Sequence, residues 1–366
     1  MRLPVIVLSL LIMSCAPRGE FVAAPNAPAS TERETIFVGT TRVAGATGYT
    51  DGRSDVASFV RYEISIPPER EAGTVTFPGP HETADPDKHF LLLDETRFGA
   101  GPEFRRSLAK AMRARRQTDA VVYVHGFNNT MAEGVLRVAQ MHYDLKVPGV
   151  AIHYAWPSSG SALAYVHDRD SVLFARAGFE SLLNEVAASG AREIVIIAHS
   201  MGGALTMEVL RQMALEHNDR VLSRIAGVVL ISPDIDVDVF RSQAREIGKL
   251  PQPFVIFGSR KDRVLGLSAI LSAEETRLGN LDDLSKISDL KVTYYDTAAF
   301  DVGSGHLNLG TNPVLLSLFG GIVGIDSAFR SDARARVGLL PGIVLTVRNA
   351  TGVILAPVVA LDNAVE

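Results

Sequence analysis

The residue best placed for covalent chemistry is Ser200, which follows an apolar run and precedes a helical pattern. Residues 194–203 read IVIIAHSMGG, so Ala198 and Gly202 stand two residues to either side of it. A tight strand-to-helix turn that presents a nucleophilic serine needs small residues at these positions, although the first is usually Gly. The helix would direct its dipole and free N–H groups at the site. A simple N-capping serine is the alternative interpretation.

A nucleophilic serine needs a general base, and His306 is the histidine placed to serve. Around this kind of turn the usual order along the chain is Ser, acid, His. Only His217 and His306 follow Ser200. His217 lies at the far end of the helix that Ser200 starts, about 25 Å away at 1.5 Å per residue. His306 ends a Gly-rich loop after the last predicted strand, and a surface-loop histidine is the alternative.

The acid that orients the base is expected between these two residues. Asp262 follows the predicted strand 254–257 in the turn GSRKDR, two strands after the nucleophile. We therefore predict Asp262 as the acid, with Asp234 as its main competitor. A solvated turn carboxylate among basic neighbours is the alternative for Asp262. Three further carboxylates lie near enough in sequence to compete: Asp236, Asp296 and Asp301.

Two backbone N–H groups are needed to stabilise an oxyanion. Met201, the residue after the nucleophile, is expected to supply one. The other is expected from Phe127, in the run HGFNN that follows the predicted strand 121–124. His125 in this run is expected to hold the loop rather than to transfer protons. Trp156 and Tyr154 follow another strand to the same edge and are candidates for the substrate pocket. For Trp156, simple packing is an equal alternative.

The elements that position these residues alternate between short apolar strands and amphipathic helices. The predicted strands are residues 36–42, 59–66, 89–93, 121–124, 149–154, 194–198, 225–231, 254–257 and 292–295. The predicted helices are residues 101–116, 168–189, 201–216 and 237–249. Continuous apolar strands between helices indicate a mostly parallel sheet with helices on both faces. Ligands of such sheets bind beyond the carboxyl ends of the strands, where Ser200, Asp262 and Phe127 fall.

The N-terminal residues 1–14 are typical of a lipoprotein-type signal peptide. Arg2 precedes an apolar core too short to span a bilayer, and Ile12-Met13-Ser14 precedes Cys15, the only cysteine. This order resembles the lipobox of bacterial lipoproteins, in which the cysteine is acylated, for example with palmitate. Ala16 lacks the acidic side chain that favours retention in the inner membrane. A conventional secretory signal is the alternative.

Three segments follow the signal peptide. Residues 15–34 are rich in Ala, Pro and Glu without periodicity, so a flexible tether is expected. Residues 35–330 are expected to form one domain. Residues 331–366 form an apolar extension with two runs, each too short to cross a bilayer. Extra strands packed on the domain are the preferred interpretation of this extension, and a membrane-facing or pocket-covering element is the alternative.

Composition excludes several classes of protein. The chain has 366 residues, 36 basic and 41 acidic, for a net charge of −5, and no basic run indicates a nucleic-acid partner. One cysteine excludes a disulfide framework and a Cys-rich zinc site. The sequence has no zinc-protease motif, phosphate-cradling Gly loop or EF-hand pattern. No metal or cofactor is therefore expected.

These motifs together resemble those of the α/β-hydrolases. More narrowly, the chain is similar to a bacterial esterase- and lipase-like family catalogued as a domain of unknown function. The segments that carry the likeness span roughly residues 36–320: IFVGTTR, YEISIPPEREAG, VYVHGFNNT, YAWPSSG, IIAHSMGG, SPDIDVDVF, FGSRKDRVL and the His306 loop. The resemblance implies an α/β-hydrolase fold and a serine hydrolase without cofactor, with Ser200, Asp262 and His306 as its triad.

The sequence therefore predicts a carboxylesterase- or lipase-type enzyme that cleaves acyl esters through a covalent acyl-enzyme. Its expected partners are a small-molecule or lipid acyl ester and, through the N-terminal anchor, a membrane. The expected location is the bacterial cell envelope, on the outer membrane. A thioesterase or amidase with the same triad is one alternative. A non-catalytic envelope lipoprotein that retains the fold is another.

Overall fold

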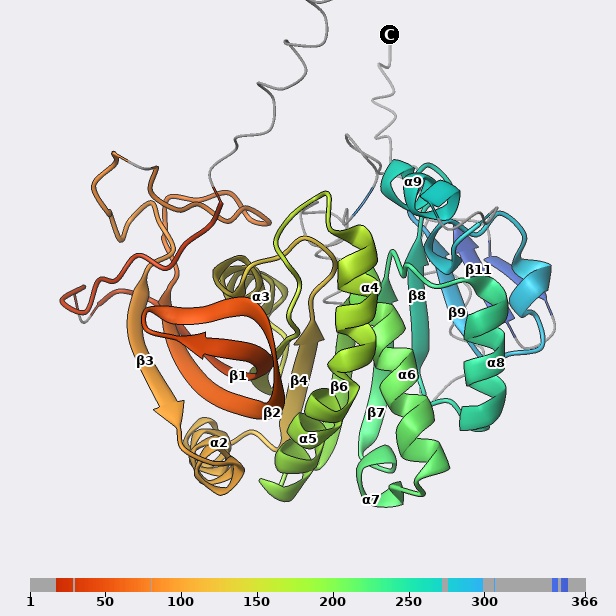
Figure 1. The fold of residues 1–366 in the computed structure, drawn as a ribbon, viewed down its shortest axis with the longest axis horizontal. Coiled ribbons are helices and arrows are strands. Elements are labelled where there is room, and N and C mark those ends of the chain that lie inside the picture. Colours follow the sequence, from red (N-terminus) through yellow and green to blue (C-terminus); the bar gives the residue numbers. More distant parts are fainter. Residues whose placement is uncertain are drawn as a thin grey trace, which may run out of the picture.

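The computed structural model describes residues 18–28, 30–79, 81–271, 276–298, 306, 344–347 and 350–354. Within them one 11-stranded sheet runs through the molecule in the order β10-β11-β9-β8-β7-β6-β4-β5-β1-β2-β3 (Figure 1). The strands are β1 (Arg33–Gly45), β2 (Gly48–Ser65), β3 (Leu92–Phe98), β4 (Asp119–Val124), β5 (Val150–Ala155), β6 (Glu193–His199), β7 (Ile225–Ile231), β8 (Phe254–Gly258), β9 (Thr293–Asp296), β10 (Val344–Val347) and β11 (Ala350–Ile354).

The central part of the sheet is parallel, as the sequence predicts. Neighbouring strands from β1 through β5, β4, β6, β7, β8 and β9 to β11 all pair in parallel. Antiparallel pairs join β1 to β2, β2 to β3, and β10 to β11. Because the parallel strands point the same way, their carboxyl ends meet at one edge, the upper end of the molecule in Figure 1.

Helices lie on both faces of the sheet. Helices α2, α5, α6 and α8 pack on one face, and α3 packs on the other (Figure 1). The helices are α2 (Gly101–Arg115), α3 (Met131–Leu145), α4 (Tyr165–Phe174), α5 (Arg176–Ala188), α6 (Met201–Leu215), α7 (Asp219–Leu222), α8 (Val237–Ile247) and α9 (Arg263–Leu271), with 3₁₀ turns η2 (Leu278–Asn280) and η3 (Leu284–Ile287).

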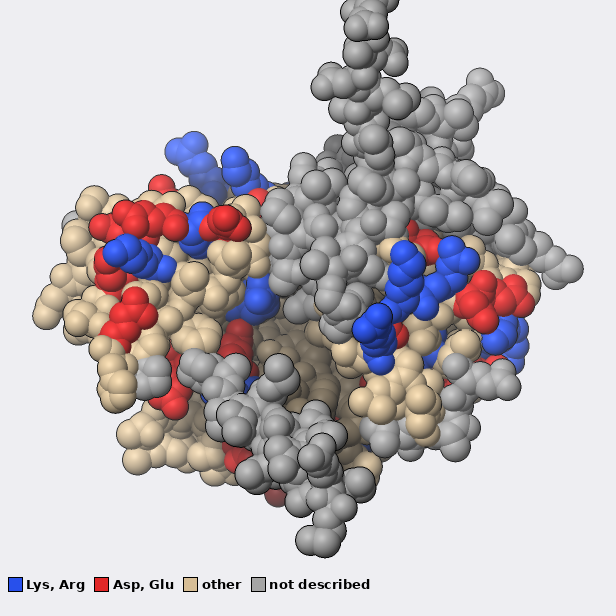
Figure 2. Space-filling view, turned by 90° about the horizontal axis from the view of Figure 1, so that it is seen from above, with Lys and Arg blue, Asp and Glu red and all other residues tan. Residues whose placement is uncertain are grey.

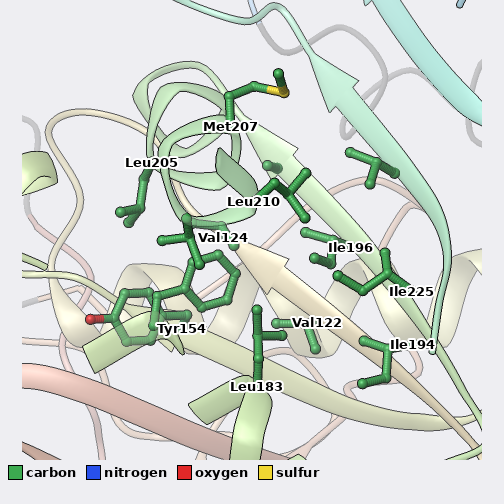
Figure 3. Close-up of a cluster of buried hydrophobic side chains, with 14 of the residues drawn as sticks. Val122, Val124, Tyr154, Leu183, Ile194, Ile196, Leu205, Met207, Leu210 and Ile225 are labelled. Carbon is green, nitrogen blue, oxygen red and sulfur yellow. The ribbon is translucent and has the colours of Figure 1, made fainter. Parts of the chain in front are cut away.

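The core between the sheet and α5 and α6 fixes the strands that carry the site. Val122, Ile196 and Leu205 come from β4, β6 and α6 and are fully buried beside one another (Figure 3). Full burial of an aliphatic side chain contributes about 1.5–3 kcal/mol. The ends of β4 and β6 are therefore held by packing against the helices on this face of the sheet.

Four local features differ from the sequence prediction. Helix α3 was not predicted, although Thr130 and Glu133 form a capping box at its start. The single helix expected over residues 168–189 is two helices, α4 and α5, that meet at Ala175. The loop expected before Phe59 is instead a long hairpin, because β1 and β2 pair as far as Gly45 and Gly48. The short strand expected over residues 89–93 is β3, which spans Leu92–Phe98.

The expectation of a free tether is wrong for the described residues between Arg18 and Glu34. Arg18 donates to Asn128 and Glu133, and the N–H of Gly19 also donates to Glu133. Phe21 stacks on Tyr62 with ring centroids 4.8 Å apart. These contacts bind the segment to the domain although its composition has no periodicity.

The C-terminal strands extend the sheet. Strands β10 and β11 form a hairpin, and β11 pairs with β9 at the sheet edge. This agrees with the expectation of extra strands for the residues described. The predicted signal peptide and Cys15 lie outside the described residues, as does most of the apolar extension. None of the described helices has the length and hydropathy to cross a membrane.

Candidate active site

Ser200 lies in the strained turn that its neighbours predict. It follows β6 and precedes α6, with φ 53° and ψ −122°. A non-glycine residue at such a φ costs about 1–3 kcal/mol, which the surrounding structure must offset. The Ser200 N–H donates to the Ile231 carbonyl of β7 at 2.9 Å, which holds the turn. Ser200 thus stands at the N-terminus of α6 and is only 3% exposed.

Two glycines allow the close approach that this turn requires. A Cβ on Gly202 would lie 2.4 Å from the His125 carbonyl oxygen and 2.6 Å from that of Val124. A Cβ on Gly126 would lie 2.9 Å from the Ser200 Cβ. The start of α6 and the loop after β4 are therefore in direct contact, and neither position has room for a side chain.

The structure brings His306 and Asp262, the residues predicted as base and acid, into direct contact. The His306 Nδ1 lies 2.8 Å from the Asp262 Oδ2, and the Asp262 side chain is fully buried. The second oxygen, Oδ1, accepts from the N–H groups of Val264 and Leu265 at 3.0 Å. This carboxylate therefore caps the start of α9 with one oxygen and holds the imidazole with the other.

Asp234, the competing acid, is engaged elsewhere. Its two carboxylate oxygens accept from Ser268 at 2.6 Å and from Tyr165 at 2.9 Å. Its Oδ1 also lies 3.1 Å from Nε of Arg277, and both side chains of this ion pair are buried. Among the described residues, Asp262 is the carboxylate that the structure brings to His306.

The two expected oxyanion donors flank the serine. Met201 begins α6, and Phe127 follows Gly126 in the loop that touches Ser200. Within the described residues, neither backbone N–H donates to an acceptor. Both groups are thus available to a developing negative charge, and the α6 dipole adds to them.

His125 holds the loop after β4, as expected. Its ring stacks on Trp156 with centroids 4.9 Å apart, and its nitrogens lie 2.8 Å from the Gly126 carbonyl oxygen and 3.1 Å from that of Trp156. The Trp156 indole in turn donates to the His125 carbonyl at 2.7 Å. Burial lowers the pKa of His125 well below its usual range.

The two pocket candidates have packing roles instead. Trp156 and Tyr154 are fully buried in the core. The Tyr154 hydroxyl donates to the Ala175 carbonyl at 2.7 Å, and its ring stacks on Phe179. The expectation that they line the substrate pocket is therefore not met, since their side chains are occupied by structural contacts.

A second histidine lies beside the base. The ring of His199, directly before Ser200, is 4.7 Å from the His306 ring between centroids. Burial first, and the charge of His306 second, lower the pKa of His199 well below its usual range. A neutral His199 thus lies against the base without adding a second positive charge.

A cavity of about 340 Å³ lies next to the loop after β4. Its walls come from this loop, α3 and the ends of β6 and β7. Gly126 and His199, both neighbours of Ser200, are among its lining residues, and Phe77, Met141 and Ile231 provide apolar surface. Such a space beside a nucleophile can receive one group of a substrate.

Two residues that support the site were not found from the sequence. Asp168 of α4 is fully buried and accepts from the hydroxyl of Ser158 at 2.5 Å and the N–H of Ser159 at 2.8 Å. Arg18 donates to the carbonyl and the side chain of Asn128 at 3.0 and 2.8 Å. Asn128 has φ 58°, so Arg18 secures a left-handed residue one position after Phe127. No motif marks either residue. The partner of Arg18 lies 110 residues away in sequence, and Asp168 binds Ser158 and Ser159 from a different element.

The described residues were also compared with the requirements of a metal site. Within the described ranges, no three His, Cys, Asp or Glu side chains are grouped so that they could hold a metal ion.

The parallel sheet, the turn at Ser200 and the following helix define an α/β-hydrolase fold. The chain belongs to the family described as alpha/beta hydrolase of unknown function (DUF900), whose model matches residues 101–303. This confirms the fold and the family that the sequence motifs resemble. A comparison with curated proteins finds no match.

A comparison with solved structures finds similarities to esterases at low identity. An esterase from Pyrococcus furiosus is 12% identical, with 84% of this chain and 96% of that chain covered and a TM-score of 0.37. An esterase from Pyrobaculum calidifontis is also 12% identical, with 82% and 86% covered and a TM-score of 0.35. A fungal esterase from Rhizomucor miehei is 11% identical, with 83% and 88% covered and a TM-score of 0.39. Similarities this low carry no argument about substrate or mechanism.

Proposed function

We propose that this α/β-hydrolase is a serine hydrolase that cleaves acyl esters, with Ser200, His306 and Asp262 as its triad. The observation that carries the proposal is the His306–Asp262 contact of 2.8 Å beside the strained Ser200 turn. A buried carboxylate that holds an imidazole next to a serine in such a turn is the arrangement that activates a hydroxyl.

The proposed reaction has two steps. His306 takes the Ser200 proton as Oγ attacks the acyl carbon, and then gives that proton to the leaving alcohol as the ester C–O bond breaks. His306 next deprotonates a water molecule as its oxygen attacks the acyl-enzyme. The bond from the acyl carbon to Oγ then breaks, His306 returns the proton to Oγ, and the carboxylic acid leaves. Asp262 orients the ring and stabilises the imidazolium. The N–H groups of Phe127 and Met201 hold the oxyanion of both tetrahedral intermediates.

The same groups could attack a thioester or an amide, so a comparison of acyl derivatives tests the ester assignment. We expect the p-nitrophenyl ester of a given acid to be cleaved with a higher kcat/KM than the thioester or anilide of the same acid. The Ser200→Ala variant measures the background for each. Faster cleavage of the thioester or anilide would contradict the ester assignment and leave the triad in place. No cleavage of any of the three would favour a non-catalytic lipoprotein that retains the fold.

The proposal extends to the location of the enzyme. We propose that Cys15 is acylated and anchors the chain in a bacterial envelope membrane. Support comes from the order of Arg2, an apolar core, Ile12-Met13-Ser14 and the only cysteine. Several acyl chains anchor far better than one, because each buried CH₂ contributes about 0.8 kcal/mol.

A Cys15→Ser variant is expected to lose lipid modification and stable membrane association. Labelling of cells with a palmitate analogue, followed by fractionation, checks both. The site residues described above do not include Cys15, so the variant is expected to retain esterase activity. Wild-type protein without label in the soluble periplasmic fraction would make residues 1–15 a conventional signal peptide.

A further inference from the structure

Helix α9 turns an apolar face outward. Val264, Leu267 and Ile270 are three residues apart, so they share one side of the helix, and they are 38%, 57% and 74% exposed. Leu265 and Ala269 on the opposite side are buried in the domain. This reverses the usual pattern of a surface helix, in which polar residues face the solvent.

A second pair of exposed apolar residues lies next to α9. Leu163 and Val166, at the start of α4, are 97% and 74% exposed. Tyr165 stands between them, and its hydroxyl lies 2.5 Å from that of Ser268, which stands between Leu267 and Ile270. This hydrogen bond joins the two sets into one surface, the apolar rim, defined as Leu163, Val166, Val264, Leu267 and Ile270.

The apolar rim borders the active site. Asp262, which holds His306, caps α9 itself. On the other side, the ring of Tyr165 meets that of Phe127 edge to face, with centroids 5.6 Å apart. The rim thus adjoins both the acid and an oxyanion donor, and α4 and α9 lie at the upper end of the molecule in Figure 1.

Positive charge flanks the apolar rim. Arg260, Lys261 and Arg263 are exposed in the turn that leads into α9. The Arg260 Nε pairs with Asp296 at 3.0 Å, and the Lys261 ammonium donates to the Ala298 carbonyl at 3.0 Å, so part of this charge is already engaged. Figure 2 views this end of the molecule and shows a group of Lys and Arg side chains to the right of a central hollow, with further basic and acidic side chains to its left. Exposed apolar side chains beside basic ones are the combination that binds surfaces of anionic lipid.

The start of the described chain is at the same end of the molecule. Arg18 donates hydrogen bonds to Asn128, which lies two residues after Gly126, and Gly126 packs against Ser200. Cys15 lies three residues before Arg18, so the chain between them can reach no more than about 11 Å. A lipid on Cys15 therefore keeps the loop after β4 close to the membrane that holds the lipid.

We propose that the apolar rim docks on the lipid surface to which Cys15 anchors the protein, so that the active site opens onto the membrane. This inference rests on the proposed function and anchor, and it deepens them, since it names the substrate class as acyl esters that reside in the bilayer. Leu163, Leu267 and Ile270 enter the interface, and the basic turn contacts anionic headgroups.

Fluorescence of the full-length chain tests the docking without reference to activity. The environment-sensitive dye NBD is attached to Ile270→Cys, to Leu163→Cys and, as a matched control, to Val56→Cys, whose residue is 73% exposed in the β1–β2 hairpin. The chain without an added cysteine controls for labelling at Cys15. On phosphatidylethanolamine–phosphatidylglycerol vesicles we expect a blue shift and quenching by lipid-borne nitroxide at 270 and 163 only. Equal, unshifted emission at all three positions would overturn the proposal.

Activity on two substrates tests the substrate class. The double variant Leu267→Asp/Ile270→Asp is expected to hydrolyse a long-chain ester dispersed in those vesicles at least about tenfold more slowly than wild type, since two apolar side chains no longer enter the lipid. Its hydrolysis of a water-soluble short-chain ester is expected to be unchanged. Leu215→Asp, an exposed apolar residue at the end of α6, should leave both rates unchanged. Equal vesicle rates in wild type and the double variant would contradict the docking. If wild type hydrolysed neither ester, the proposed function would fail, and the fluorescence would still decide the docking.

Discussion

A Ser200→Ala variant is expected to hydrolyse a p-nitrophenyl ester about 10⁶-fold more slowly than wild type, the loss seen when a triad serine is removed. Without Oγ no acyl-enzyme can form, and the oxyanion donors alone supply only a small residual rate. The fold should persist, because the Ser200 side chain makes no capping hydrogen bond and alanine has nearly the same volume. Steady-state kcat/KM and thermal unfolding of the two proteins check both statements.

Ser232 supplies a matched control for this substitution. It follows β7, the neighbouring strand, has φ 43° and is 6% exposed, so it shares the backbone region and burial of Ser200. Ser232→Ala is expected to retain most of the activity. An equal loss in both variants would mean that the Ser200 effect comes from disturbance of the sheet edge and not from loss of the nucleophile.

An Asp262→Asn variant is expected to lose about 10⁴-fold in kcat, by analogy with replacement of the acid in other serine hydrolases. The amide oxygen can still accept from Val264 and Leu265, which places the amide NH₂ toward the Nδ1 of His306. An NH₂ donor there favours the imidazole tautomer with its proton on the wrong nitrogen for accepting the serine proton. The geometry thus survives while the base is disabled, and pre-steady-state acylation rates measure the effect.

Asp234→Asn separates the two acid candidates. Asp234 holds Tyr165, Ser268 and Arg277, so its replacement weakens a buried ion pair and should lower the melting temperature while reducing kcat far less. Thermal unfolding and kcat are measured on both variants. A larger loss of kcat in Asp234→Asn than in Asp262→Asn would overturn the assignment of the acid.

Much of the fold could be predicted from the sequence, because buried parallel strands are continuous apolar runs. The run Ile225–Ile231 is a strand with those bounds, and the positions of Ser200 and Asp262 follow from the strands before them. His306 could be assigned by chain order alone, since one other histidine follows Ser200 and it lies at the far end of α6. Local sequence patterns are therefore enough to predict site residues that directly follow a strand.

Other features depend on contacts between distant segments and leave no local pattern. Arg18 and Asp168 act on the loop after β4 from 110 and 40 residues away in sequence. The burial of Trp156 comes from its stacking on His125, so the residue type alone could not separate pocket from core. Helix α3 is the exception, because its Thr130–Glu133 capping box is a local pattern that is visible in the sequence.

The most direct test of the central claim is the site of covalent modification by a fluorophosphonate. Such a reagent reacts with a serine that is activated by a neighbouring base, and peptide mapping by mass spectrometry identifies the residue. We predict one adduct on wild-type protein, on Ser200, and none on Ser200→Ala. An adduct on a different serine, retained labelling of Ser200→Ala, or an unmodified wild-type protein would contradict the assignment of Ser200 as the nucleophile.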